Sequence, residues 1–234
     1  MNEIIKANDK TGMRWYKVPG ASSALPSVTA ILHRYSPEGP GLARWKASTN
    51  NWEEVLRRSG IIGTLVHYRI ACWFAEHFKL APVELDLQGG GLSMDMIEQS
   101  NTVMSYFEDL IRERKFVPEA IEKTCWHRRA MYAGTIDYIG RFEGVRALVD
   151  WKTGSGVYPN YRAQAYAYKR ALMSDPHFKG VIDQCVIIVI NASRGLKVEV
   201  VDDEEAAGRM WWSAFDGFQV DQRPQAQWIR QGDL

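Results

Sequence analysis

Two charged residues stand two positions apart in an apolar stretch of the chain, "ALVDWKTG" at positions 147–154. The neighbours of Asp150 and Lys152 predict a buried strand. Because side chains alternate between the faces of a strand, the carboxylate and the ammonium share one face. Burying either group without a partner costs several kcal/mol, so we expect each to meet a partner of opposite charge.

Turn signals place further acids beside Asp150. Glu143-Gly144 is expected to form a two-residue hairpin turn, which sets Asp137 directly opposite Asp150. A second hairpin turning at Arg129-Ala130 would set Glu122 opposite Asp137. The sequence therefore predicts a row of three carboxylates on neighbouring strands.

Clustered carboxylates at this spacing suit a hard divalent cation such as Mg²⁺ or Mn²⁺. A lysine beside them can hold an anionic phosphate, and it can orient or help deprotonate an attacking water. This combination is typical of metal-assisted phosphodiester hydrolysis. The alternative is a pair of acids on an exposed sheet face, which the apolar neighbours of Asp150 disfavour.

Three further polar residues have two interpretations each. His67 lies on an apolar helical stripe in "GTLVHYRIACWF", where it could be a hydrogen-bonded core residue or a nitrogen ligand to the metal. Gln164 and Tyr168 are four residues apart on a predicted helix, so they share a face. Both can hydrogen-bond a phosphate or the lysine, although such a pair also occurs often by chance.

The surrounding pattern predicts an α/β (α+β) fold with a central mixed sheet flanked by helices. Residues 1–26 are expected to be irregular with a short hairpin, and Ser27 is expected to cap the first helix. We expect a single domain over 1–234, with a helical arch or wall at about 27–117 and a catalytic sheet core with a closing helix at about 118–216. The predicted helices are 28–35, 42–58, 61–79, 93–115, 160–173 and 202–215, and the predicted strands are 121–127, 131–142, 146–152, 183–191 and 197–201.

Composition narrows the class of protein. The chain has 234 residues, 46% of them hydrophobic and 24% charged, which predicts a packed core. It has no apolar run long enough for a membrane span and no signal-peptide pattern, so we expect an intracellular, cytoplasmic protein of a bacterium, or of a virus in its host's cytoplasm. The three cysteines, Cys72, Cys125 and Cys185, are far apart, which argues against a disulfide framework or a metal site built from cysteines alone.

Taken in order, these motifs resemble the PD-(D/E)XK nuclease superfamily, and within it the RecB-type exonuclease branch, which includes the CRISPR-associated RecB-like exonucleases and the mitochondrial genome maintenance exonucleases. The resemblance spans residues 25–170 and implies a restriction-endonuclease-like sheet. No single motif is specific, but the ordered set is. It consists of "LPSVTAIL", "GTLVH", "AIEKT", "AGTID", "LVDWKTG" and "QAYAY".

The resemblance assigns roles to individual residues. His67, Asp137, Asp150 and the backbone carbonyl of Trp151 would bind the metal, and Lys152 would be the catalytic lysine. Gln164 and Tyr168 would steady the lysine or the DNA, and Glu122 would be an outer group or a ligand to a second metal. Many RecB-like relatives carry four cysteines for an Fe–S cluster, which this chain lacks, so we expect no Fe–S cluster.

We therefore expect a metal-dependent DNA exonuclease that acts on single-stranded ends, with replication or recombination proteins as possible partners. The expected DNA contacts are Arg57, Arg58, Arg69, Trp45, Trp52 and Thr153, with Trp73 as a further stacking residue. The alternatives are a structure-specific or double-strand endonuclease and a non-catalytic DNA-binding module of the same fold. A small-molecule α/β enzyme is disfavoured, because "GGG" at 89–91 lacks the lysine of a phosphate-binding loop.

Overall fold

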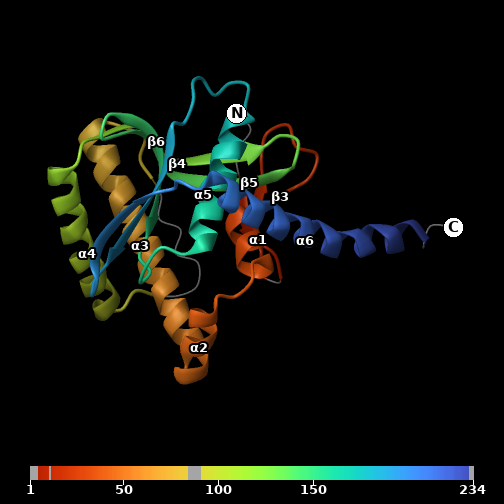
Figure 1. Ribbon diagram of the computed structural model, residues 1–234, viewed down its shortest axis with the longest axis horizontal. Helices are drawn as coiled ribbons and strands as arrows, with labels where there is room; N and C mark the ends of the chain where they lie inside the picture. The colour runs from red at the N-terminus through yellow and green to blue at the C-terminus, as the bar shows by residue number, and fades with distance from the viewer. Residues whose placement is uncertain (1–4, 11, 84–90, 232–234) are drawn as a thin grey trace.

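A five-stranded mixed sheet forms the centre of the protein (Figure 1). The computed structural model describes residues 5–10, 12–83 and 91–231. The strand order is β4-β5-β6-β7-β8, and only β6 and β7 are parallel, with α5 (Pro159–Met173) between them in the chain. The predicted α+β class is thereby confirmed. The strands are β4 (Phe116–His127), β5 (Tyr132–Phe142), β6 (Val145–Lys152), β7 (Gln184–Asn191) and β8 (Gly195–Val200).

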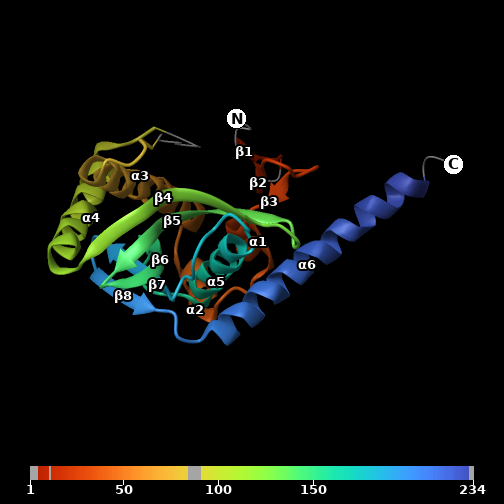
Figure 2. The ribbon, with the colours of Figure 1, turned by 90° about the horizontal axis from the view of Figure 1, so that it is seen from above.

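Helices cover both faces of this sheet (Figure 2). On one face, α3 (Trp52–Phe78) and α4 (Met94–Glu113) bury an aromatic cluster around Trp151. On the other, α1 (Val28–Tyr35) and α6 (Glu204–Gln231) pack with α5 around a second core. The predicted helical wall is therefore divided, because α1 belongs to the layer of α5 and α6.

The predicted strand registers are confirmed. Phe142 pairs with Val145 directly across the Glu143-Gly144 turn, whose two residues have φ of +53° and +82°. Positive φ at both positions is the type I′ geometry, which matches the twist of the two strands. In the neighbouring hairpin, the pairs Ile121–Tyr138 and Lys123–Ile136 bracket Glu122, so it lies level with Asp137 as predicted. The predicted two-residue turn of this hairpin was wrong, because the last pair is His127–Tyr132 and residues 128–131 form the turn.

A small second sheet precedes the main one. It has the order β1 (Ile5–Asn8), β2 (Arg14–Lys17) and β3 (Leu25–Pro26), where only a short hairpin was expected. The Tyr16 hydroxyl lies 3.2 Å from Thr135 Oγ1, and a backbone bridge joins Ser27 to Ala133. The small sheet is thereby attached to β5.

Two predicted helix boundaries were wrong in the region before the sheet. The predicted interruption between residues 58 and 61 is absent, because α3 continues through Gly60. A helical glycine costs only about 1 kcal/mol, which packing of α3 against α4 and the sheet can offset. The chain breaks instead at Asn51, in the left-handed region with φ of 56°, so that α2 (Pro40–Ser48) is a separate helix.

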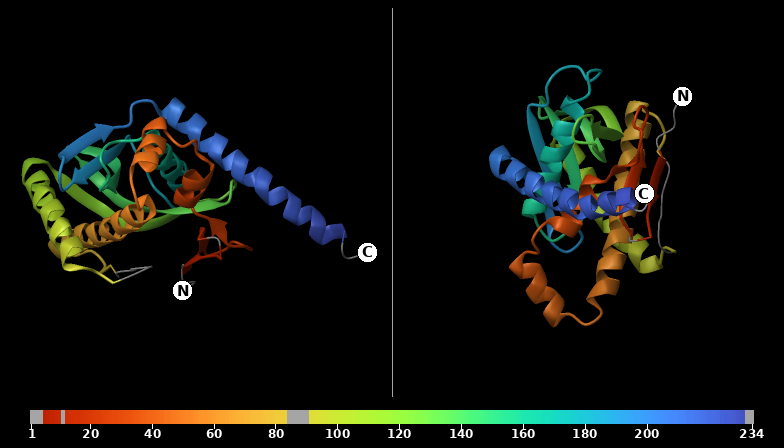
Figure 3. Two further views of the ribbon diagram at one scale, coloured as in Figure 1. Left: turned by 90° about the horizontal axis from the view of Figure 1, so that it is seen from below. Right: turned by 90° about the vertical axis from the view of Figure 1, so that its right-hand side faces the viewer.

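Other elements extend beyond their predicted ends. Helix α6 continues past residue 215 and projects from the body (Figure 3). Gly217 does not end the helix, and a Cβ at that position would be in van der Waals contact with Tyr35 of α1, 3.4 Å away. Strand β4 begins before Pro118, which is tolerated because β4 is an edge strand with a register shift at that point.

Two further predictions concern the loop before α4 and the absence of a membrane span. Residues 84–90, which include most of the predicted loop before α4 and part of "GGG", lie outside the described residues. None of the helices in the described part of the chain combines the length and the apolar character that crossing a membrane requires.

Candidate active site

The β5–β6 hairpin brings Asp137 and Asp150 together. The pairing of the two strands runs from Phe142–Val145 at the turn to Tyr138–Val149, and Asp137 and Asp150 are the next residues along each strand. At that point the Asp137 side chain accepts a hydrogen bond of 2.8 Å from the Trp151 backbone N–H. Asp150 is 1% exposed and Asp137 9%, so both carboxylates are buried. Local strand pairing therefore places both acids at one end of the hairpin.

Asp150 is held by side chains from two elements. Lys152, two residues along β6, contacts Asp150 Oδ2 through Nζ at 2.6 Å. Gln164 of α5 donates to Asp150 Oδ1 at 3.2 Å and accepts from Lys152 Nζ at 3.3 Å. The same Gln164 Nε2 lies 2.9 Å from the Tyr168 hydroxyl. The four side chains thus form one connected polar network.

Helix α5 reaches this network because β5 carries a glycine beneath it. A Cβ at Gly134 would lie 2.2 Å from the Tyr168 ring, so no larger residue fits there while Tyr168 keeps its place. On the other side, a Cβ at Gly63 of α3 would lie 3.2 Å from Thr153 Oγ1, just past β6. The two small residues let helices from opposite faces of the sheet approach the same strand ends.

A second group of ligand atoms comes from three different elements. His67 of α3, Glu122 of β4 and Asp137 of β5 each offer one ligand atom, and these atoms all lie within 4.8 Å of one another. His67 Nδ1 is 3.3 Å from Asp137 Oδ1. The histidine therefore faces the carboxylates, which favours the ligand interpretation over that of a core histidine.

Glu122 has an unusual backbone conformation. Its φ of +47° lies in the left-handed region, which costs a residue with a side chain roughly 1–2 kcal/mol. Glu122 stands between Ile121 and Lys123, which both pair with β5. Such strain is retained where the surrounding structure imposes it, often at functional sites.

The pKa values of the three carboxyl groups are shifted in different directions. Burial raises the pKa of Glu122 to about 7, with a further contribution from Asp137. Burial likewise raises the pKa of Asp150 to about 6, despite the opposing charge of Lys152. Burial alone would raise the pKa of Asp137 as well, but the neighbouring His67, Lys152 and the Trp151 N–H together hold it below its usual range.

The two cationic groups of the site are stabilised by the acids. Burial alone would lower the pKa of His67, but the charge of Asp137 and its hydrogen bond outweigh this and raise the pKa to about 8. Burial also opposes ionisation of Lys152, yet Asp150 and Asp137 raise the pKa of the lysine above its usual value. The lysine is therefore an ammonium at neutral pH in the metal-free site.

These residues fit a divalent cation. Three carboxylates and one ammonium leave two negative charges when the imidazole is neutral, which is the form that binds metal. Carboxylate oxygens suit Mg²⁺ and Mn²⁺, and an imidazole nitrogen favours the transition metal. The three residues brought together most closely are His67, Glu122 and Asp137, with Asp150 joined to the lysine beside them.

The residues expected to contact DNA lie on α2, α3 and the segment after β6. Arg57 forms two hydrogen bonds to Glu54, and Arg58 pairs with Asp95 of α4. Arg69 donates to Ser100 at 2.5 Å and to Asn101 at 2.7 Å, so it ties α3 to α4.

The predicted stacking tryptophans differ in their surroundings. Trp45 of α2 and Trp52 at the start of α3 are half-buried, and the ammonium of Lys46 lies 4.6 Å from the Trp52 ring. Trp73 stacks on His77 at 3.9 Å and meets Phe107 edge-on, so at least one of its faces is already covered by the protein. Trp73 is therefore a poorer candidate for stacking on bases than the other two.

Two residues of the network escaped sequence reasoning. The Lys152 ammonium lies 5.0 Å from the centre of the Tyr161 ring, a cation–π distance. Tyr161 shares the helical face of Gln164 and Tyr168, so the spacing could have revealed it. Thr29 of α1 lies 3.3 Å from the Tyr168 hydroxyl, a contact that no local pattern signals.

Comparison with known proteins gives one informative similarity. The chain is 24% identical over 210 residues to the mouse (Mus musculus) protein named mitochondrial genome maintenance exonuclease 1. The chain is thus similar to a nuclease. The match covers 83% of this chain but only 58% of the mouse protein, so the chain spans little more than half the length of this relative. No family profile matches the sequence.

Proposed function

We propose that the protein is a metal-dependent DNA exonuclease of the RecB-type branch of the PD-(D/E)XK superfamily. The observation that carries this proposal is the buried Asp150–Lys152 pair beside the His67, Glu122 and Asp137 group at one end of the sheet. The similarity to a genome maintenance exonuclease supports the same activity. The substrate would be single-stranded DNA with a free end, in replication, recombination or repair.

The metal would be Mg²⁺ or Mn²⁺, with no Fe–S cluster. His67, Asp137 and Asp150 would hold it together with the Trp151 carbonyl, and Glu122 lies close enough to His67 and Asp137 to take part. When bound, such an ion lowers the pKa of water and stabilises the negative charge that develops on a phosphate.

Lys152 would bind the phosphate. Its raised pKa keeps it protonated in the metal-free site, so there it donates hydrogen bonds and cannot accept a proton. Its Nζ is fixed by Asp150, by Gln164 and by the face of Tyr161. We assign Gln164 and Tyr168 to positioning this ammonium. The amide oxygen of Gln164 accepts a hydrogen bond from Lys152, and its amide nitrogen donates one to the Tyr168 hydroxyl.

The single-stranded DNA would approach the site along α2 and α3. In Figure 1, α2 and the beginning of α3 extend from the body below the sheet. Trp45 and Trp52 would stack on bases there, and Arg57, Arg58 and Arg69 would contact phosphates after exchanging their present partners. Thr153 would contact the strand where α3 passes β6.

The proposal predicts a specific loss in Lys152→Ala. End-labelled linear single-stranded DNA is incubated with Mg²⁺, Mn²⁺ or EDTA, beside a circular single strand. The wild type is expected to shorten the linear strand from its ends only when metal is present, and Lys152→Ala is expected to lose this activity by at least about a hundredfold. Lys197→Ala is the matched control, because that lysine is exposed on β8 and pairs with Glu199.

Folding is checked by the thermal midpoint of each variant, since breaking a buried ion pair costs about 3–5 kcal/mol. Lys152→Arg, which keeps the charge, should remain folded and still cleave poorly. Cleaved circles would instead indicate an endonuclease. Bound but uncut DNA in either metal would indicate a non-catalytic binding module.

A further inference from the structure

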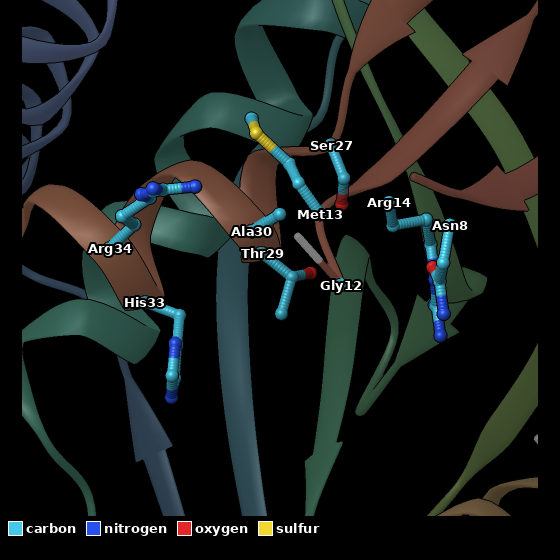
Figure 4. A pocket seen from close by; sticks show the side chains of 9 residues that line it. All are labelled: Asn8, Gly12, Met13, Arg14, Ser27, Thr29, Ala30, His33 and Arg34. Atoms are coloured by element: carbon cyan, nitrogen blue, oxygen red, sulfur yellow. The ribbon is translucent and has the colours of Figure 1, made fainter. Parts of the chain in front are cut away.

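A cavity of about 470 Å³ lies between α1 and the N-terminal sheet (Figure 4), and its lining contains none of His67, Glu122 and Asp137. This volume is within the range of small-molecule pockets, about 300–1,000 Å³. Its described lining includes three basic side chains and no carboxylate. The lining residues are Asn8, Gly12, Met13, Arg14, Ser27, Thr29, Ala30, His33 and Arg34.

One wall of this pocket holds a hydroxyl that has no partner. Ser27 occupies the N-cap position of α1, as predicted, but its side chain makes no capping hydrogen bond. The residue is fully buried, and its Oγ has no hydrogen-bond partner among the described residues. A buried unsatisfied polar group costs about 1–3 kcal/mol. Figure 4 shows this hydroxyl directed into the space beside Gly12 and Thr29.

The pocket has the chemistry of an anion site. The first N–H groups of a helix have no partner within the helix, and the start of α1 at Ser27 and Thr29 lies in the wall. Arg14 of β2 and Arg34 of α1 add positive charge from two sides. The acid in the same hairpin, Asp9, is engaged by the Met13 N–H and by Trp15 Nε1.

A chain of hydrogen bonds connects the pocket with the candidate active site. Thr29 lines the pocket and contacts the Tyr168 hydroxyl, which in turn contacts Gln164. Gln164 binds both Asp150 and Lys152. Two side chains, Tyr168 and Gln164, therefore connect Thr29 in the pocket to the Asp150–Lys152 pair.

We propose that this pocket binds a phosphate group of the substrate strand, next to the phosphodiester that Lys152 contacts. The proposal rests on the proposed nuclease function. The Ser27 hydroxyl and the N-terminus of α1 donate hydrogen bonds to the phosphate oxygens, and Arg14 and Arg34 neutralise its charge. The phosphate is either the terminal group of the strand or an internal one.

Ser27→Ala is the sharpest test, because the hydroxyl has no partner to lose. Affinity for an internally labelled single-stranded oligonucleotide is measured in EDTA, where no cleavage occurs. We expect about fivefold weaker binding, with a thermal midpoint within about 2 °C of the wild type. A serine that caps the helix would give the opposite result, a lower midpoint with unchanged affinity, and would overturn the proposal.

The arginines are tested through the salt dependence of binding. Arg14→Gln and Arg34→Gln should each reduce the slope of log affinity against log salt by about 0.7, the value for one phosphate contact on a single strand. Arg112→Gln is the control, since Arg112 lies on α4 across the sheet and pairs with Asp109. Unchanged slopes in both pocket variants, with wild-type cleavage intact, would overturn the pocket and leave the nuclease standing.

Three oligonucleotides distinguish the two phosphate sources: one with a 5′-phosphate, one with a 3′-phosphate and one with hydroxyls at both ends. A terminal site predicts that the effect of Arg14→Gln is confined to one phosphorylated oligonucleotide, whereas an internal site predicts the same effect on all three. If the wild type neither cuts nor binds DNA, the proposed function fails. The phosphorus NMR signal of added inorganic phosphate would then test the pocket alone. Broadening of this signal by the wild type but not by Arg14→Gln would support phosphate binding in the pocket, and a signal that the wild type does not broaden would reject it.

Discussion

Asp150 and Lys152 are compatible with an apolar strand because each partly satisfies the other. The two groups form an ion pair of 2.6 Å, and Gln164 donates one hydrogen bond to Asp150 and accepts one from Lys152. The raised pKa of Asp150, about 6, shows that burial still outweighs this compensation. The pair is therefore costly in a metal-free protein, which argues for a role in function.

At the residue scale, Glu122 predicts how stability depends on pH. Its pKa is raised to about 7 in the folded, metal-free protein, so the folded state holds the proton more tightly than the unfolded state. The resulting stabilisation is complete below the unfolded pKa, near 4.5, and is lost as pH rises through 7. Glu122→Gln removes this loss. In EDTA the variant should gain thermal stability relative to the wild type between pH 5 and pH 8.

Glu98→Gln serves as the control for this experiment, because Glu98 is exposed on α4 and away from the acidic group. Its difference from the wild type should stay constant over the same pH range. A constant difference for Glu122→Gln as well would contradict a raised pKa of the Glu122 carboxyl in the metal-free site.

At the scale of the elements, the β5–β6 hairpin and α5 form the polar network of the candidate active site through close contact. Gly134→Ala would place a Cβ 2.2 Å from the Tyr168 ring, which rests against β5. Such overpacking costs about 1–3 kcal/mol, and urea unfolding should report a loss of this size. Because Tyr168 must move, the hydrogen bond to Gln164 should be disturbed and cleavage should fall with stability.

Gly156→Ala is the matched variant, because nothing lies within 4 Å of a Cβ at that position. It is expected to change stability by less than about 0.5 kcal/mol. Equal effects of the two substitutions would show that the contact between β5 and Tyr168 is not what positions α5.

At the scale of the whole molecule, the two helical layers meet at one end of the sheet. His67 comes from the layer of α3 and α4, whereas Gln164 comes from the layer of α1, α5 and α6. The candidate metal ligands His67, Glu122 and Asp137 join α3 to β4 and β5. Binding of a cation there should therefore stabilise the folded state as a whole.

Mn²⁺ at a hundredfold excess over its dissociation constant should stabilise the wild type by about 2.7 kcal/mol. His67→Ala should reduce the Mn²⁺-induced rise in thermal midpoint, because the nitrogen ligand is lost. His177→Ala, at an exposed position after α5, should leave the rise unchanged. A full Mn²⁺ effect in His67→Ala would remove this histidine from the metal site.

The sequence by itself determined the local part of the site. A two-residue turn at Glu143-Gly144 fixes the register of its two strands, so Asp137 and Asp150 meet wherever the hairpin folds. The alternation along β6 places Lys152 beside Asp150 for the same reason. These relations depend on neighbours in the chain, which a sequence pattern records directly.

Only the tertiary structure decided which distant side chains join them. His67 meets Asp137 because α3 packs against one face of the sheet, and the sequence pattern predicted the helix but not this placement. Thr29 reaches Tyr168 because α1 packs against β5, α5 and α6, and in this packing the Ser27 hydroxyl has no hydrogen-bond partner among the described residues. Such contacts arise from the packing of layers, whose geometry no local periodicity specifies.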